Sequence, residues 1–225
     1  MAKGIIIGAG PSVFEKKHLD ILAKSNYNGT LLITDKMLKP CLDASVTPQR
    51  FSRYFVFTIE DLEKIANFFI ETPHSNKIKV ICSERTKKSV MDKILSNNYN
   101  ISIDSWDYLK VTPNVGLMAF CFAWRELKLD ELCLIGMDSG TPEMNIPMNE
   151  NSEAFTLFYK KIYNPDIDKW TYLNPSAQIW RESFMDFLDL FEYDKDAICN
   201  CTEGGSLFGK GIKTMRFKDW LLWKQ

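Results

Sequence analysis

Ile5-Ile6-Ile7-Gly8-Ala9-Gly10-Pro11-Ser12 is the stretch of sequence that decides the fold. The isoleucines form a short, continuous apolar run, which is typical of a strand buried on both faces of a parallel sheet. Two glycines follow the run, and then Ser12 and Glu15 stand at the spacing of a capping box, which marks the start of a helix. The stretch therefore predicts a buried strand that turns through glycines into a helix.

The rest of the chain repeats this alternation of strand and helix. Apolar runs bounded by turn residues predict further strands at 31–33, 54–57, 78–82, 101–103, 132–135 and 197–199. Helical spacing of apolar residues predicts helices at 62–69, 90–95, 115–127, 180–191 and 217–223. Strands that alternate with helices imply βαβ units, so we predict an α/β fold, Rossmann-like, with a mainly parallel sheet and helices on both faces.

We predict one α/β domain over residues 1–225. The segment 140–176 breaks the alternation and holds Pro142, Pro147, Pro165 and Pro175. Such an irregular segment is either a lid over a site or a surface insertion, here with a short helix at 155–162. Both interpretations stay open at this point.

Composition excludes several classes of function. Lys and Arg number 28 and Asp and Glu 29, and this balance argues against nucleic-acid binding. The longest apolar runs fall well short of the roughly 20 residues of a membrane span. Without a signal-peptide pattern, we expect a cytoplasmic protein. The six cysteines form no C-x-x-C pair and the chain has two histidines, which argues against zinc. An aromatic content of 13% leaves room for a homodimer.

The first loop is a candidate for binding phosphate. Gly8 and Gly10 allow the backbone to approach a ligand closely, and Pro11 and Ser12 lead into a helix N-terminus, which attracts anions. The alternative is that Ser12 only caps the helix. Val13 stands where the dinucleotide-binding fingerprint has its third glycine, and no G-K-[ST] follows, so neither that motif nor a Walker loop is complete.

Other polar residues follow later strands. Asp35 comes directly after the second strand, where it either binds a ribose hydroxyl or is an exposed loop acid. Asn114 is a good helix N-cap, and Gly116 in the first turn costs roughly 1 kcal/mol relative to Ala, which suggests close approach of a ligand or of backbone.

Two further loops carry carboxylates. Asp138, in Ile135-Gly136-Met137-Asp138-Ser139-Gly140, projects at the carboxyl end of the sheet and is our candidate for binding Mg²⁺; the alternative is a turn aspartate. The last strand is followed by Asn200-Cys201-Thr202-Glu203-Gly204-Gly205, which is either a ligand loop or a glycine-rich turn. Because the carboxyl ends of parallel strands share one edge of the sheet, we expect these loops to converge with the first one.

The motifs G-A-G-P-S, N-V-G, I-G-M-D and N-C-T-E-G-G occur in this order, and with them the chain resembles the archaeal 6-hydroxymethylpterin pyrophosphokinases (MptE-like). It is also similar to bacterial motility accessory factors and, more distantly, to CMP-sialic-acid transferases. The resemblance covers residues 4 to about 211.

The resemblance implies an enzyme that uses Mg²⁺ to transfer diphosphate from ATP to 6-hydroxymethyl-7,8-dihydropterin. The partners would then be a nucleotide and a small-molecule acceptor. Asp138 and Glu203 are the catalytic candidates, and Asp138 the metal ligand. The cofactor-binding candidates are Gly8, Gly10, Pro11, Ser12, Asp35, Asn114, Gly116, Asn200, Thr202, Gly204 and Gly205.

Two alternatives stay open. One is a glycosyltransferase that takes a CMP-linked nonulosonic or sialic acid as donor. The resemblance implies a histidine base after the G-x-D strand in that branch, and this chain has no histidine after His74. The other alternative is a non-catalytic nucleotide-binding module.

Overall fold

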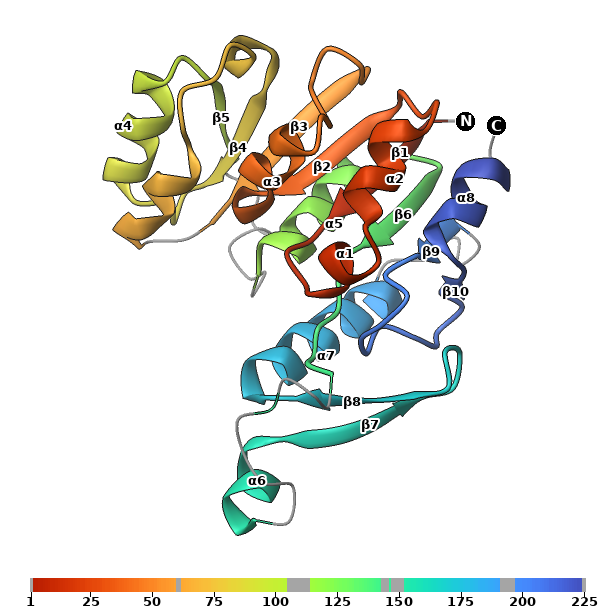
Figure 1. Ribbon diagram of the computed structural model, residues 1–225. Coiled ribbons are helices and arrows are strands. Elements are labelled where there is room, and N and C mark those ends of the chain that lie inside the picture. The colour runs from red at the N-terminus through yellow and green to blue at the C-terminus, as the bar shows by residue number, and fades with distance from the viewer. Residues whose placement is uncertain are drawn as a thin grey trace.

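The computed structural model describes residues 2–59, 62–104, 114–142, 146, 152–190 and 197–223. Its centre is an eight-stranded sheet in the order β10-β9-β6-β1-β2-β3-β4-β5, in which every neighbouring pair is parallel (Figure 1). The strands are β1 (Lys3–Ile7), β2 (Thr30–Thr34), β3 (Arg53–Thr58), β4 (Lys79–Ser83), β5 (Asn100–Asp104), β6 (Glu131–Ile135), β9 (Ile198–Asn200) and β10 (Lys213–Thr214). The seven predicted strands are confirmed, and β10 is additional.

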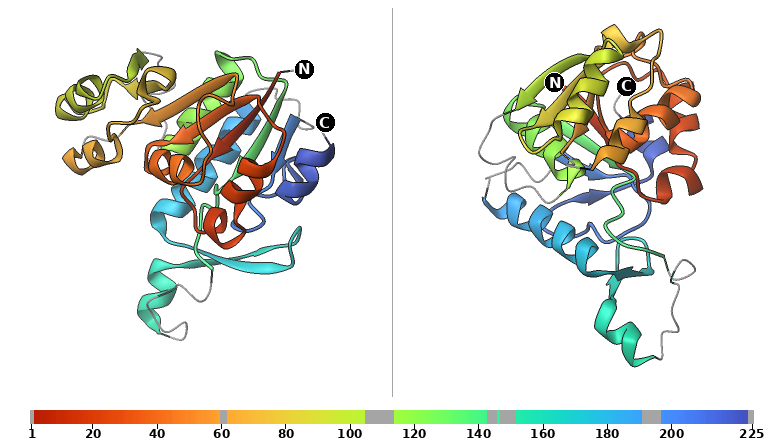
Figure 2. Two further views of the ribbon diagram at one scale, coloured as in Figure 1. Left: turned by 45° about the horizontal axis from the view of Figure 1, so that its top comes forward. Right: turned by 90° about the vertical axis from the view of Figure 1, so that its left-hand side faces the viewer.

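Helices cover both faces of the sheet, which confirms the predicted Rossmann-like α/β fold (Figure 2). Alternate side chains of β1 enter two separate cores: Ile5 and Ile7 point to one face, Ile6 to the other. The first core is completed by α2 (His18–Lys24), α3 (Leu38–Asp43), α4 (Lys88–Ser96) and α8 (Phe217–Trp223). The second is completed by α5 (Val115–Arg125) and α7 (Pro175–Leu190).

Short helical turns occupy several loops. They are α1 (Ser12–Glu15), η1 (Asp35–Met37), η2 (Glu63–Phe68) and η3 (Ser75–Lys77). The α-helix predicted at 62–69 is therefore a 3-10 helix. Its apolar spacing is nevertheless used, because Ile65 and Phe69 are buried in the first core.

The segment 140–176 contains α6 (Glu153–Phe158) and an antiparallel hairpin of β7 (Lys160–Asn164) and β8 (Lys169–Leu173). The helix predicted at 155–162 is wrong beyond residue 158, because residues 160–164 pair with β8. The hairpin lies beyond the carboxyl ends of the central strands (Figure 1). Asn164 Nδ2 and Thr171 Oγ1 both donate to the carbonyl oxygen of Gly205, at 3.0 and 3.3 Å, so the half of the hairpin nearer its turn is attached to the loop after β9. Residues 143–145 and 147–151 of the segment lie outside the described residues.

The six cysteines are all buried free thiols. In the described part of the chain, none of the helices combines the length and the hydropathy needed to span a bilayer.

Candidate functional site

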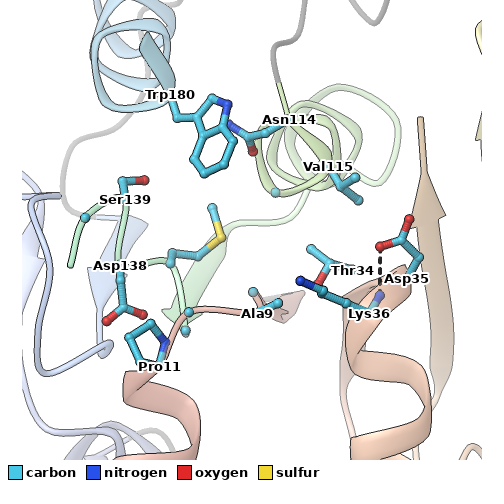
Figure 3. Close-up of a pocket in the computed structure, with 16 residues that line it drawn as sticks. Ala9, Pro11, Thr34, Asp35, Lys36, Asn114, Val115, Asp138, Ser139 and Trp180 are labelled. Atoms are coloured by element: carbon cyan, nitrogen blue, oxygen red, sulfur yellow. Dashed lines mark hydrogen bonds between the residues drawn. The ribbon is translucent and has the colours of Figure 1, made fainter. Parts of the chain in front are cut away.

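The candidate site lies where the strand order reverses. The chain runs from β1 through β2 to β5 on one side of the sheet, and β6 then returns to the other side of β1. At such a switch point the loops after the two central strands diverge and leave a crevice at their carboxyl ends, which is where open α/β sheets bind ligands. Here a cavity of about 350 Å³ lies between the loops after β1, β2 and β6, the start of α5 and one residue of α7 (Figure 3).

The loops after β1 and β6 are packed against each other through glycine. A Cβ on Gly8 would lie 2.4 Å from the carbonyl oxygen of Gly136, and one on Gly10 would lie 1.8 Å from Asp138 Oδ2. The amides of Gly8 and Gly10 donate to the carbonyls of Ile135 and Gly136, at 2.8 Å each. These glycines therefore serve loop packing. That they also contact phosphate stays a prediction, as does any contact of Pro11, which lines the cavity, with a ligand.

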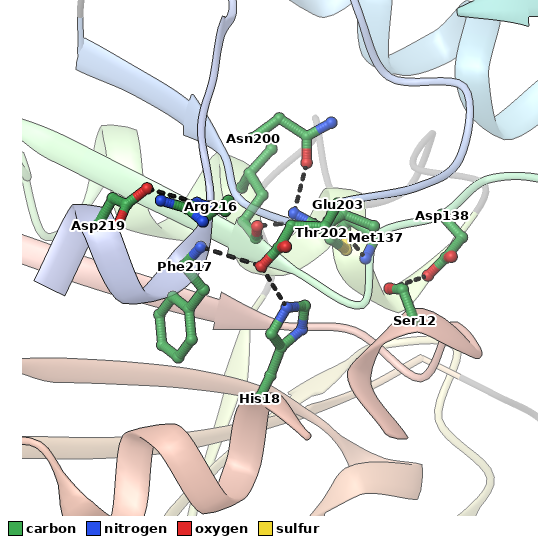
Figure 4. A network of polar contacts seen from close by, with 11 residues as sticks. Ser12, His18, Met137, Asp138, Asn200, Thr202, Glu203, Arg216, Phe217 and Asp219 are labelled. Atoms are coloured by element: carbon green, nitrogen blue, oxygen red, sulfur yellow. Dashed lines mark hydrogen bonds and ion pairs between the residues drawn. The ribbon is translucent and has the colours of Figure 1, made fainter. Parts of the chain in front are cut away.

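Ser12 does not cap its helix. The N-cap position of α1 is Pro11, which makes no side-chain cap hydrogen bond, and the Ser12 hydroxyl donates instead to Asp138 Oδ2 at 2.8 Å (Figure 4). The capping-box prediction is wrong, because the close approach of the two loops brings a carboxylate to the serine. Ser12 is itself buried, at 3% exposure.

Asp138 is a buried carboxylate of the site. It is 5% exposed, and it lines both the large cavity and a smaller neighbour of about 80 Å³. Burial raises its pKa to about 6, while the hydrogen bond from Ser12 acts in the opposite direction. The predicted metal ligand therefore stands at the wall between two cavities, in surroundings that leave its charge only partly compensated.

The loop after β2 contributes an acid and a base to the large cavity. Asp35 is buried, and its Oδ1 accepts from the backbone amide of Lys36 at 2.7 Å. The Lys36 side chain is exposed and extends toward Ala9 (Figure 3). Lys36 was not among the predicted site residues.

The start of α5 forms another wall of the large cavity. Asn114 caps the helix as predicted, its Oδ1 accepting from the Leu117 amide at 2.9 Å. A Cβ on Gly116 would lie 2.7 Å from both Sδ and Cε of Met137, so this glycine makes room for the Met137 thioether. Both predicted residues line the cavity, together with Met137 and Trp180, which the sequence analysis did not assign to the site.

Asn200 and Thr202 lie behind the site. Both are buried; Asn200 Nδ2 donates to the Leu207 carbonyl at 2.6 Å, and Thr202 Oγ1 accepts from the Met137 amide at 3.2 Å. Neither residue lines the two cavities. Thr202 thus holds the loop after β6 and Asn200 holds the loop after β9, and ligand contact by either side chain stays a prediction.

Glu203 links the start of α8 to α2. Its Oε1 accepts from the first amide of α8, Phe217, at 3.1 Å and lies 3.2 Å from His18 Nε2 (Figure 4). His18 is fully buried, and desolvation lowers its pKa despite the neighbouring carboxylate, so it is neutral and donates through Nε2. Glu203 also lines the small cavity with Gly204 and Gly205, so its catalytic role stays a prediction.

The small cavity lies between α1, the hairpin and the loop after β9. Two lysines line it, Lys16 from the first loop region and Lys169 from β8. Asp138 Oδ1 faces this side, since a Cβ on Gly204 would lie 3.5 Å from it. Lys16 and Lys169 were not among the predicted site residues. Only the fold brings them to Asp138.

The carboxylate of Asp138 fits a magnesium ion that binds together with a phosphate ligand. Among the described residues there is no cluster of three or more His, Cys, Asp and Glu side chains that would hold a metal. Mg²⁺ usually keeps several waters and binds through one or two carboxylates plus substrate phosphates. Asp138 alone therefore suits an ion that arrives with a polyphosphate, and does not suit a resident ion held by protein ligands only.

An open parallel sheet with a crevice at its switch point defines a protein of the Rossmann-like α/β class. The family model described as 6-hydroxymethylpterin diphosphokinase MptE-like matches residues 1–144, and the chain belongs to that family. The resemblance to the MptE-like family is thereby confirmed over residues 1–144, and the N-C-T-E-G-G motif at 200–205 lies beyond the matched residues. Neither the curated proteins nor the solved structures contain a match to the chain.

Proposed function

We propose that the chain transfers diphosphate from ATP to the hydroxymethyl group of 6-hydroxymethyl-7,8-dihydropterin, with Mg²⁺, and releases AMP. The observation that carries the proposal is the place of Asp138, a buried carboxylate that walls two adjoining cavities at the switch point. Membership of the MptE-like family supports the substrate pair.

The reaction has a simple balance. The acceptor hydroxyl oxygen forms a bond to the β-phosphorus of ATP, the bond from that phosphorus to the α,β-bridging oxygen breaks, and AMP leaves with the bond's electrons. The hydroxyl proton passes to solvent or buffer. Phosphoryl-type transfer requires mainly positioning and neutralisation of charge.

The residues that line the two cavities can position the phosphates and neutralise their charge. Asp138 would bind Mg²⁺ together with the phosphates of the nucleotide, and the ion would neutralise the charge of those phosphates. Lys36 in the large cavity and Lys16 and Lys169 in the small one supply the protein's own positive charge. We place the nucleoside in the large cavity and the transferring phosphates at Asp138, where the two cavities meet.

The test is AMP formation from ATP and the pterin alcohol, with and without Mg²⁺, followed by chromatography. Asp138→Asn keeps the shape of the side chain and removes the charge, so we expect kcat/KM to fall about a hundredfold or more. Asp186→Asn is the matched control, because Asp186 is an exposed carboxylate on α7 that lines neither cavity.

Two results would remove the proposal. One is wild-type AMP formation no faster than that of Asp138→Asn. The other is release of CMP from a CMP-linked sugar in the absence of any reaction with ATP, which would assign the chain to glycosyl transfer instead.

A further inference from the structure

We propose that the indole of Trp180 is the surface on which the base of the bound nucleotide stacks. The inference rests on the proposed use of a nucleotide and adds a residue that recognises it. Trp180 lies outside residues 1–144, the part of the chain that the family model matches.

Trp180 departs from the packing of its own helix. The buried face of α7 carries Ala177, Phe184, Met185 and Leu188, each at most 8% exposed. Trp180 is 39% exposed although the apolar spacing of the sequence places it in the same stripe. Its ring borders the large cavity instead of filling the core (Figure 3). A large aromatic surface is thereby left for a planar ligand to cover.

The helix that carries Trp180 is held firmly at this point. Asn174 caps α7 through its Oδ1, which accepts from the Ala177 amide at 2.8 Å. The neighbouring Arg181 donates through Nε to the Ser206 carbonyl at 2.9 Å, and its guanidinium lies 5.3 Å from the ring centre of Phe208. A stacking surface on an anchored helix needs little ordering when a ligand binds, which favours affinity.

The surroundings of the indole suit a nitrogen heterocycle. Met137, whose thioether is held between Gly8 and Gly116, and Val115 give the cavity an apolar lining. The Asn114 side chain lines the same cavity as the indole (Figure 3). Its Oδ1 is used by the helix cap, so its Nδ2 is the atom that can donate to a ring nitrogen or carbonyl of a base.

The large cavity therefore has two unlike ends. Trp180 and Asn114 lie at one end, and Lys36 and the glycine loop lie at the other (Figure 3). This arrangement orients a nucleotide with its base at the indole and its phosphates at the glycine loop, where Gly10 packs against Asp138, as the proposed function requires. The two ends can be tested separately, because a sugar phosphate without a base uses only the second.

The experiment compares calorimetric binding of AMP, CMP and ribose 5-phosphate to the wild-type chain and to Trp180→Ala, Trp180→Phe and Ile179→Ala. Ile179 is the matched control, since it is 54% exposed on the same turn of α7 and lines neither cavity. We expect Trp180→Ala to weaken AMP binding about tenfold or more and to leave ribose 5-phosphate unchanged. Trp180→Phe should retain most of the affinity, and Ile179→Ala all of it.

Equal weakening of AMP and ribose 5-phosphate by Trp180→Ala would overturn the proposal, as would a wild-type chain that binds AMP no more tightly than ribose 5-phosphate. AMP formation from ATP tests the proposed function separately. A Trp180-dependent affinity without AMP formation from ATP leaves the stacking role standing and removes the reaction. Normal turnover with unchanged KM for ATP in Trp180→Ala supports the reaction and removes the stacking role.

Discussion

The loops after β6 and β9 invite comparison, because their strands are neighbours and each loop offers glycines and one carboxylate. In the first loop Asp138 is held by Ser12 and walls two cavities. In the second, Glu203 bonds to the first amide of α8 and lies at His18. Both carboxylates bond to the first residue of a helix, Ser12 of α1 and Phe217 of α8. They differ in their other surroundings, because Asp138 also borders the large cavity whereas Glu203 also contacts His18.

The largest expected effect comes from the contact between the two loops. A Cβ on Gly205 would lie 2.1 Å from the carbonyl oxygen and 2.5 Å from Cα of Asp138, at a residue with φ of +74°. Gly209 has a similar φ of +87° but nothing within 4 Å of a Cβ. We expect Gly205→Ala to cost roughly 3 kcal/mol or more, and Gly209→Ala only the roughly 1–2 kcal/mol of its backbone conformation. Urea unfolding measures both; equal costs would show that the loops do not depend on this contact.

Asp138 should lower stability at neutral pH. Its folded-state pKa is raised from 3.8 to about 6, so stability is full at low pH and is lost as pH rises through 6, by about 3 kcal/mol in total. Asp138→Asn removes this dependence. We therefore expect it to unfold at a higher temperature than the wild-type chain at pH 7.5 without metal, with a smaller gain at pH 4. Under the proposed function we expect the same variant to lose activity, which is the trade-off between stability and activity that is common at functional carboxylates. A gain independent of pH would contradict the assignment.

Glu203 should behave in the opposite way. Glu203→Ala leaves the His18 ring and the Phe217 amide without their acceptor, so we expect a stability loss of about 1–2 kcal/mol. Glu203→Gln retains an acceptor and should cost less. Below the unfolding temperature, kcat should be unchanged in both. A fall in kcat with wild-type stability would instead support the catalytic role that the sequence predicts for Glu203.

The smallest effect is expected at Ser12. Its hydroxyl bonds to Asp138 Oδ2 and favours the charged carboxylate. Ser12→Ala should therefore raise the pKa of Asp138 further and cost about 1 kcal/mol at pH 8, and less at pH 4. The control is the same change in an Asp138→Asn background, where thermal unfolding should show a smaller loss. Identical losses in the two backgrounds would mean that Ser12 acts without Asp138.

The sequence predicts the central sheet well, because each buried parallel strand is a short apolar run that packing alone explains. It fails at the hairpin, where β7 pairs with β8 and Asn164 and Thr171 make tertiary contacts to Gly205. It also fails at η2, whose apolar spacing suits an α-helix but whose backbone is 3-10.

The candidate site could be predicted only in part. The loops that meet at the switch point follow from strand order, and Asn114 and Asp138 line the large cavity as expected. The task of Ser12 could not be predicted, because the carboxylate that competes with helix capping stands 126 positions away. Trp180 belongs to the apolar stripe at 180–191. An aromatic residue in such a stripe is predicted to be in the core until the orientation of the helix is known.

Asp138 lines two neighbouring cavities, and this has a thermodynamic consequence. Whatever fixes its ionisation from the large cavity also sets the charge that a molecule in the small cavity meets. Linkage makes such an influence reciprocal, so occupancy of either side must change affinity on the other by the same factor. Ligands of the two cavities that respond to the charge of Asp138 therefore do not bind independently of each other.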